Sequence, residues 1–513
     1  MVQYMDNGFN QWANTQSAKK PSRFSGFLLW LGLFFLAWWL MGLWLKPNNI
    51  QSNVQNTFNI EKTIVASRNI SNDEISADVS GLRISNIVLK QHLNDAKTKE
   101  NVSLLSNENN FIEVGFVSSD AKTPNVNTNW NLKSGTMYYG TNVSFARNIT
   151  LDGYVIKVSD VIKNNSGQEI NISPYVRIVQ SGNDKASGVV ESGGVVYANS
   201  KLEYANWNKL NKKSYAYSSV RGSLGFANQY WETIASVDAN DQTISVKKSG
   251  DYYVADTSVA AIKIPAHEQK EINTYVFSGP RETTAVNAAE NNIPGISKTI
   301  DYGWFWFFAQ PMLWMINWLF ALVGNYGVAI ILMTLILRIL IWPLTRKSFA
   351  STMAMQKMQP ELQRVQKLYA NDKARLQMEM MKVYQTHKTS PMSGCLPMLI
   401  QIPIFFALYK ALLISVPMRS ARFLWISDLA AMDPYFILPI LMGATMWLQQ
   451  YLQSVKPQSG VNDAMASTQR AMKWMPVLFT VMFAWMPSGL VLYWTISNLF
   501  GILQMYIIKK TNK

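Results

Sequence analysis

Long runs without a charged residue are the feature that most constrains how this chain of 513 residues can fold. Residues 24–45 form an uncharged run of 22 residues, and residues 302–337 form one of 36. About 20 apolar residues in a helix cross the hydrocarbon layer of a membrane, so the first run predicts one transmembrane helix. The second run, about 54 Å long as a single helix, exceeds one crossing. We expect it to be broken into an amphipathic helix at the membrane interface (302–322) and a span (323–342), because Trp residues and Pro311 cluster in its first part.

Four further apolar segments follow in the C-terminal half of the chain. The sequence "PSG" at Pro487–Gly489 divides the last uncharged block into two short helices joined by a tight turn. Together with the two spans above, these segments predict a polytopic α-helical membrane protein with six spans, five of them clustered after one large domain. The four segments are 396–416, 435–452, 474–486 and 490–508, with the turn at 487–489.

The distribution of charge predicts which loops face the cytoplasm. Residues 344–394 carry nine Lys and Arg against three acids, whereas residues 417–434 carry two of each. Basic loops alternating with a neutral loop are typical of the positive-inside rule rather than of a nucleic-acid surface, so no DNA partner is expected. We therefore expect a cytoplasmic N-terminus (1–23), an uncleaved signal anchor (24–45), an outside domain (46–301), a cytoplasmic helical hairpin (343–395), an outside loop (417–434), a cytoplasmic loop (453–473) and a cytoplasmic tail (509–513).

The segment from about residue 48 to residue 299 has a different character. Short runs of β-branched and aromatic residues such as "GYVIKVSDVI" and "DYYVADTSVAAIKI" alternate with Asn, Ser and Gly. This pattern predicts a large all-β, sandwich-like domain. Its acidic residues are dispersed and show no catalytic spacing, and the single cysteine and three scattered histidines exclude a multi-cysteine metal site.

A helical pair is expected between the second and third spans. Apolar residues recur at 3–4 spacing from Met355 to Tyr369, "AND" at Ala370–Asp372 breaks the pattern, and the spacing resumes at Leu376. One interpretation is a solvated coiled-coil spacer. The other is an adaptable apolar surface for varied hydrophobic segments, provided by the methionines of this region (Met353, Met355, Met358, Met378, Met380, Met381 and Met392).

Arg338 stands within an otherwise apolar run in the second span. A charge at mid-bilayer costs roughly 2.5–3.5 kcal/mol, so such a residue either reaches the interface or marks a functional site. Polar residues form one stripe on each of several spans, and no acid in the spans can pair with the arginine. A single buried amide is usually a contact between helices, but stripes on several helices favour a shared hydrated cavity. The stripes contain Thr334, Gln401, Ser497, Asn498 and Gln504.

With these residues in place, the C-terminal half resembles the YidC-type membrane protein insertase family. The resemblance covers residues 301–508 and rests on "DYGWFWF", "LRILIWPLT", "GCLPMLIQIPIFFALY", "DPYFILPILMG" and "PSGLVLYWTISNL". The large β domain resembles the periplasmic domain of the Gram-negative form. The resemblance implies a groove open to the cytoplasm and to lipid, with Arg338 as its arginine and with Thr334, Phe405, Tyr493 and Trp494 in contact with the inserting segment.

The expected function is insertion and folding of inner-membrane proteins, alone or with the Sec translocon. No phosphate-binding loop occurs in the sequence, so we expect neither nucleotide hydrolysis nor a cofactor, and no enzymatic activity. The resemblance implies nascent membrane proteins, the Sec translocon, the ribosome, the signal recognition particle receptor and membrane lipid as partners; the short end "KKTNK" argues against a tail-based ribosome contact. The alternatives are a solute transporter with an anion site at Arg338, and a scaffold for the translocon.

Overall fold

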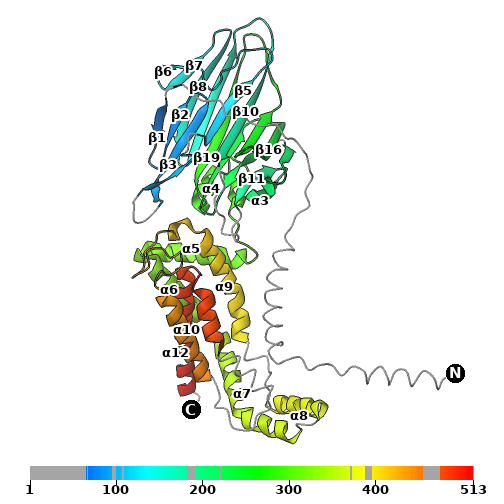
Figure 1. Ribbon diagram of the computed structural model, residues 1–513, viewed down its shortest axis with the longest axis vertical. Helices are drawn as coiled ribbons and strands as arrows, with labels where there is room; N and C mark the ends of the chain where they lie inside the picture. Colours follow the sequence, from blue (N-terminus) through cyan, green and yellow to red (C-terminus); the bar gives the residue numbers. More distant parts are fainter. Residues whose placement is uncertain are drawn as a thin grey trace, which may run out of the picture.

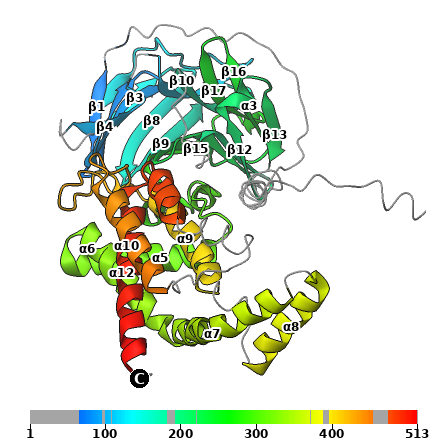
Figure 2. The ribbon, with the colours of Figure 1, turned by 60° about the horizontal axis from the view of Figure 1, so that its bottom comes forward.

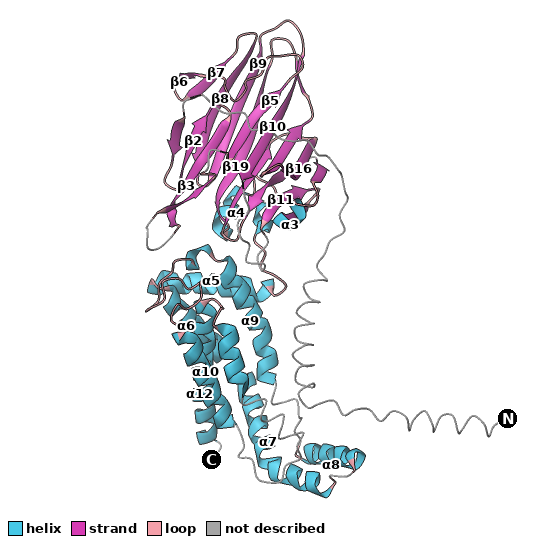
Figure 3. Ribbon diagram, viewed as in Figure 1, coloured by secondary structure: helices cyan, strands magenta, loops and turns pink. Residues whose placement is uncertain are grey.

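The structure is a computed structural model with two parts, an all-β domain and a helical region (Figure 1). It describes residues 65, 67–94, 100–106, 109–181, 192–219, 221–369, 372–387, 396–453 and 474–511. The expected N-terminus (1–23), first span (24–45) and cytoplasmic loop (453–473) lie outside the described residues, apart from position 453. Figure 3 shows the strands gathered in one part and nearly all helices in the other.

The β domain consists of two large sheets that face each other, and their described strand pairs are antiparallel (Figure 2). The ten-stranded sheet contains β1 (Arg68–Ser71), β2 (Ile75–Ser80), β3 (Arg83–Leu93), β4 (Asn101–Leu104), β5 (Phe111–Val117), β10 (Ile170–Ser181), β13 (Tyr215–Ser219), β16 (Gln242–Ser249), β17 (Tyr252–Val259) and β18 (Ile262–Ile264). The nine-stranded sheet contains β6 (Asn131–Lys133), β7 (Thr136–Tyr139), β8 (Val143–Asp152), β9 (Val155–Asn164), β11 (Gly193–Ala198), β12 (Lys201–Asn206), β14 (Ser223–Ala227), β15 (Trp231–Val237) and β19 (Gln269–Pro280). The predicted all-β domain is confirmed.

Alternation of side chains explains why these segments become strands. In β2 and along most of β10, buried positions alternate with partly buried ones, as expected when one face of each sheet packs on the other. The largest cluster of the resulting core consists of aliphatic and aromatic side chains from both sheets, and smaller clusters accompany it. It also contains an ion pair, in which Arg147 donates from Nε and Nη2 to the two carboxylate oxygens of Asp160 at 2.8 and 2.9 Å.

The helical elements follow the β domain in sequence, except for one short helix inside it. They are α3 (Trp207–Leu210), α4 (Thr283–Ala289), η1 (Ile296–Thr299), α5 (Trp306–Val323), α6 (Tyr326–Leu340), α7 (Trp342–Leu368), α8 (Lys373–Thr386), α9 (Leu396–Ile414), η2 (Val416–Met418), α10 (Ile437–Gln453), a helix over Trp474–Phe483 and α12 (Ser488–Thr511). In Figure 1, α5 lies across the end of the helical bundle that faces the β domain, and α7 and α8 project from the opposite end.

Local sequence explains where the long uncharged run breaks. Gly324 ends α5 in the left-handed conformation at φ 69°, and the side chain of Asn325 accepts a hydrogen bond from the Val328 amide to begin α6. Further on, α6 and α7 meet at Ile341 with a bend of 63° between Tyr326–Leu340 and Trp342–Ser351, beside Pro343. The bend directs α7 away from the bundle (Figure 2).

By length and composition, two described helices can cross a membrane, namely Trp306–Val323 and Ser488–Lys510. The bent pair of α6 and the start of α7 gives a third if it counts as one span, and the apolar helices over Gln401–Ile414 and Trp474–Phe483 are shorter. The first of these, α5, is the helix that the sequence places at the interface. The structure supports a helical region with a few apolar spans, and the number of six remains a prediction.

Candidate functional site

Three helices bring polar side chains together in the interior of the bundle. Arg338 on α6 donates from Nε to Oγ of Ser497 on α12 at 2.7 Å, and its Nη2 also contacts this hydroxyl. Gln401 on α9 donates from Nε2 to the Tyr493 hydroxyl at 2.6 Å. Tyr493 lies four residues before Ser497 on α12 and interacts electrostatically with Arg338. We call Arg338, Gln401, Tyr493 and Ser497 the polar chain.

The charge of the polar chain is not neutralised by a carboxylate. No Asp or Glu of the described residues lies within 4 Å of the Arg338 guanidinium. Ser497 and Tyr493 are almost fully buried, at 1% and 3% exposure, while Arg338 is half-buried. A guanidinium has five N–H donors, so a single serine leaves most of its hydrogen-bonding capacity for water or for another group.

Aromatic side chains lie beside the polar chain. The Phe405 ring on α9 packs edge-on against Trp494 on α12, with ring centroids 5.3 Å apart, and lies 5.7 Å from Phe483. Trp494 also contacts Phe483 at 5.2 Å and Phe479 at 6.1 Å. Phe479 and Phe483 were not among the predicted site residues, although their spacing of four residues in "FTVMF" places them on one helix face. We call Phe405, Phe479, Phe483 and Trp494 the aromatic cluster.

Three of the predicted residues lie elsewhere. Thr334 is fully buried, and its hydroxyl donates to the Ile330 carbonyl of its own helix at 2.6 Å. Asn498 faces α10 instead, where its Nδ2 lies 3.3 Å from Oγ1 of Thr445. Gln504 is 1% exposed, and neither polar atom of its side chain has a hydrogen-bond partner among the described residues.

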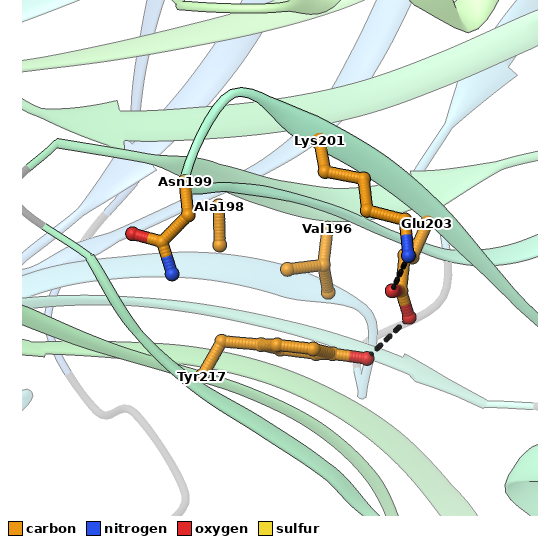
Figure 4. A pocket seen from close by; sticks show the side chains of 6 residues that line it. All are labelled: Val196, Ala198, Asn199, Lys201, Glu203 and Tyr217. Atoms are coloured by element: carbon orange, nitrogen blue, oxygen red, sulfur yellow. Dashed lines mark hydrogen bonds and ion pairs between the residues drawn. The ribbon is translucent and has the colours of Figure 1, made fainter. Parts of the chain in front are cut away.

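The β domain contains a pocket of about 210 Å³ at the end of its β11–β12 hairpin (Figure 4). Val196 and Ala198 face the ring of Tyr217 across it, and Asn199, Lys201 and Glu203 complete the lining. The Glu203 carboxylate accepts from the Tyr217 hydroxyl at 2.7 Å and pairs with Lys201 at 3.0 Å. These contacts hold the pocket wall together, and among the described residues no group of His, Cys, Asp and Glu could hold a metal ion.

Comparisons with known proteins agree with this division into two parts. Residues 69–315 match the family model described as "YidC periplasmic domain", and residues 318–513 match the model described as "60Kd inner membrane protein". The proteins named "Membrane protein insertase YidC" from Magnetococcus marinus and Rhizobium meliloti are 35% and 33% identical to this chain. The alignments cover 79% and 85% of this chain, and 75% and 80% of those proteins.

A solved structure similar to the β domain is a galactose mutarotase related enzyme from Lactobacillus acidophilus, 9% identical with a TM-score of 0.30 over 42% of this chain and 97% of that one. Of the functions that the sequence left open, the family models and the relatives support the insertase and not the solute transporter. The chain belongs to the YidC family of membrane protein insertases, as an inner-membrane protein with a periplasmic domain and not an enzyme.

Proposed function

We propose that this insertase passes hydrophobic segments of nascent proteins through a hydrophilic groove between α6, α9 and α12, open to the cytoplasm and to lipid. The observation that carries the proposal is the contact of Arg338 with one serine hydroxyl and no carboxylate among the described residues. A charge in this position requires water or an incoming polar group. A client must move a polar segment across the hydrocarbon layer to the outer side of the membrane. Water around the polar chain shortens the apolar distance that this segment crosses.

The aromatic cluster is the expected contact for the apolar part of a client. Phe405 and Trp494 lie on the two helices that also carry Gln401 and Tyr493, so polar and apolar contacts are offered side by side. Transfer of a client's apolar surface to lipid supplies the driving force at about 0.8 kcal/mol per buried CH₂. Insertion then needs no nucleotide hydrolysis. The groove increases the rate at which a client is inserted.

The projecting pair of α7 and α8 is proposed to capture clients early. Met358, Leu362 and Val383 form its buried seam, while Met378 and Met381 are 60% and 50% exposed. Exposed methionines adapt to apolar partners of different shape. Deletion of residues 345–387 should abolish insertion of at least some clients, and unchanged insertion of every client would leave only a spacer role.

The distribution of charge supports the proposed topology, with both termini in the cytoplasm and residues 46–301 in the periplasm. Clients are the partners that membership of the family implies. The Sec translocon, the ribosome and the signal recognition particle receptor are proposed as further partners on the resemblance alone.

Photo-crosslinking to a stalled nascent chain tests the groove. A photoreactive amino acid at Phe405 or Tyr493 should crosslink to the client's membrane segment. Ile440 on α10 provides the control position, because its side chain is 61% exposed and α10 contributes no residue to the polar chain. Crosslinks of equal yield from Ile440, or none from Phe405 and Tyr493 at normal protein level, would contradict the groove.

A further inference from the structure

The β domain is attached to the helical region by more than the linker that joins them. Val416, in the short helix after α9, is 4% exposed and belongs to the core cluster of the β domain. Gln229, in the turn before β15, donates from Nε2 to the Leu413 carbonyl at 2.8 Å. This bond satisfies one of the carbonyls that the last turn of α9 leaves without a helical partner.

Arg419, three residues after Val416, makes the most extensive of these contacts. Its Nη1 donates to the Leu93 carbonyl at 3.1 Å, and its Nη2 donates to the Asn94 carbonyl at 2.7 Å. The guanidinium carbon lies 5.6 and 5.7 Å from the ring centroids of Tyr230 and Trp231. No carboxylate of the described residues lies within 4 Å of it.

These partners require an arginine. Two carbonyls at the end of β3 accept from different nitrogens of one planar group, and the guanidinium carbon lies at cation–π distance from two aromatic rings. The ammonium group of a lysine has neither the forked N–H donors nor the planar shape of a guanidinium. The contact is therefore specific to the guanidinium rather than to the positive charge.

A titratable group lies in the same cluster. The His92 ring packs edge-on against Trp231 at 5.1 Å between centroids, and its Nε2 lies 3.0 Å from the Tyr154 hydroxyl. Burial and the positive charge of Arg419 lower the pKa of His92 below its ordinary value of 6.5. Beyond Tyr154, Glu74 and Glu282 are the acids that act on this side of the cluster.

We propose that Arg419 is the positioning residue that fixes the periplasmic domain on the outer end of α9, and that protonation of His92 loosens this fixation. An imidazolium would bring a second positive charge next to Arg419 in a partly buried cluster. The undocked state binds the proton more readily, so docking weakens as the pH falls below about 6.5. The inference does not depend on the groove.

Distance measurements between two spin labels on the full chain in lipid test the proposal. The single cysteine is removed by Cys395→Ser, and the labels are attached after Lys133→Cys on β6 and Met432→Cys in the outer loop. Both sites are exposed and lie outside the cluster. The intact cluster should give one narrow distance distribution at about pH 8 and a broader one at about pH 5.5, on either side of the ordinary histidine pKa.

Variants separate the two parts of the proposal. Arg419→Ala and Arg419→Lys should both broaden the distribution at about pH 8, whereas Arg422→Ala, which removes an identical charge from the same loop, should not. His92→Gln should keep the distribution narrow at about pH 5.5. A narrow distribution in Arg419→Ala would overturn the positioning role, and a distribution that broadens equally with pH in His92→Gln would overturn the role of the histidine.

Discussion

Two arginines, one buried in the β domain and one half-buried in the helical region, show how differently the two parts of this molecule use charge. In the β domain, Arg147 is 1% exposed and meets both oxygens of Asp160, so the core contains a neutral pair. In the helical region, Arg338 meets one neutral hydroxyl of Ser497. A charge that is paired within the protein can only contribute to the fold. A charge without such a partner among the described residues remains available to water, and the proposed function uses this charge to receive a client.

The largest effect is expected from breaking the neutral pair. Arg147→Ala leaves the Asp160 carboxylate buried without its partner, so the free energy of unfolding of the β domain should fall by about 3–5 kcal/mol. Pulse proteolysis of the full chain in urea measures this quantity from the β-domain fragment. Lys133→Ala, at an exposed position of β6, serves as the control and should change it by less than about 0.5 kcal/mol. A loss below about 1 kcal/mol in Arg147→Ala would show that the pair is not structural.

A second buried acid in the β domain should make stability depend on pH. Burial raises the pKa of Glu232 from 4.5 to about 7, against the opposing effects of Arg281 and Thr299. The folded state then binds more protons than the unfolded state between these values, so stability should decrease as the pH rises from about 4.5 to about 7. The expected change is roughly 1–3 kcal/mol. In Glu232→Gln, the same unfolding measurement should show a flatter pH profile, and an unchanged slope would contradict the assignment.

Removing the charge of Arg338, which has no carboxylate partner among the described residues, should have a smaller and more selective effect. Arg338→Ala should reduce insertion of clients with acidic outside segments by about tenfold, roughly 1.4 kcal/mol, because the attraction that offsets their crossing is lost. Arg338→Lys should retain much of the activity, since both nitrogens of the arginine contact the same Ser497 oxygen and an ammonium group can donate to it. Insertion of paired clients with acidic or neutral tails distinguishes this role from a membrane anchor. Equal losses for both tails, at normal protein level, would refute it.

The smallest effect on insertion is expected from removing the β domain altogether. A chain that joins the first span directly to Tyr302 should insert clients within about twofold of the full chain per molecule, because the polar chain and the aromatic cluster lie wholly in the helical region. Protein level should fall, since Val416 loses the core in which it is buried. Quantified insertion per molecule measures the difference. Broad loss of insertion in a stably expressed chain would mean that the two regions do not act separately.

Sequence patterns gave the two-part architecture because each part has a strong local signature. Alternation along β2 and β10 predicts sheets, and the uncharged runs, with breaks expected after residue 322 and at Pro487, predict separate helices. The structure places the first break at Gly324. What the patterns lacked was the rotation of each helix. Residues one position apart on α12 differ by about 100° around the axis, so Ser497 meets Arg338 while Asn498 meets α10.

The docking of the β domain onto the helical region could also not be predicted from the sequence. Nothing local marks Val416 as a core residue of a domain that ends more than a hundred residues earlier, because its packing partners come from another part of the chain. The neutral loop around Arg419 was predicted to lie outside the membrane, but its contacts with Leu93 and Trp231 depend on tertiary structure alone. Long-range contacts of this kind produce no periodic pattern in the amino-acid sequence from which they could be predicted.

The place of Val416 in the β-domain core has a consequence for the order of events during synthesis. The last described helix of that domain ends at Thr299, so the ribosome must add 117 further residues before this side chain exists. At roughly 5–20 residues per second, that interval is about 6–23 s. During that interval the β-domain cluster lacks the Val416 side chain, which is added only after α9 has been synthesised. The final packing of the periplasmic domain therefore depends on a residue that follows α9 in the order of synthesis.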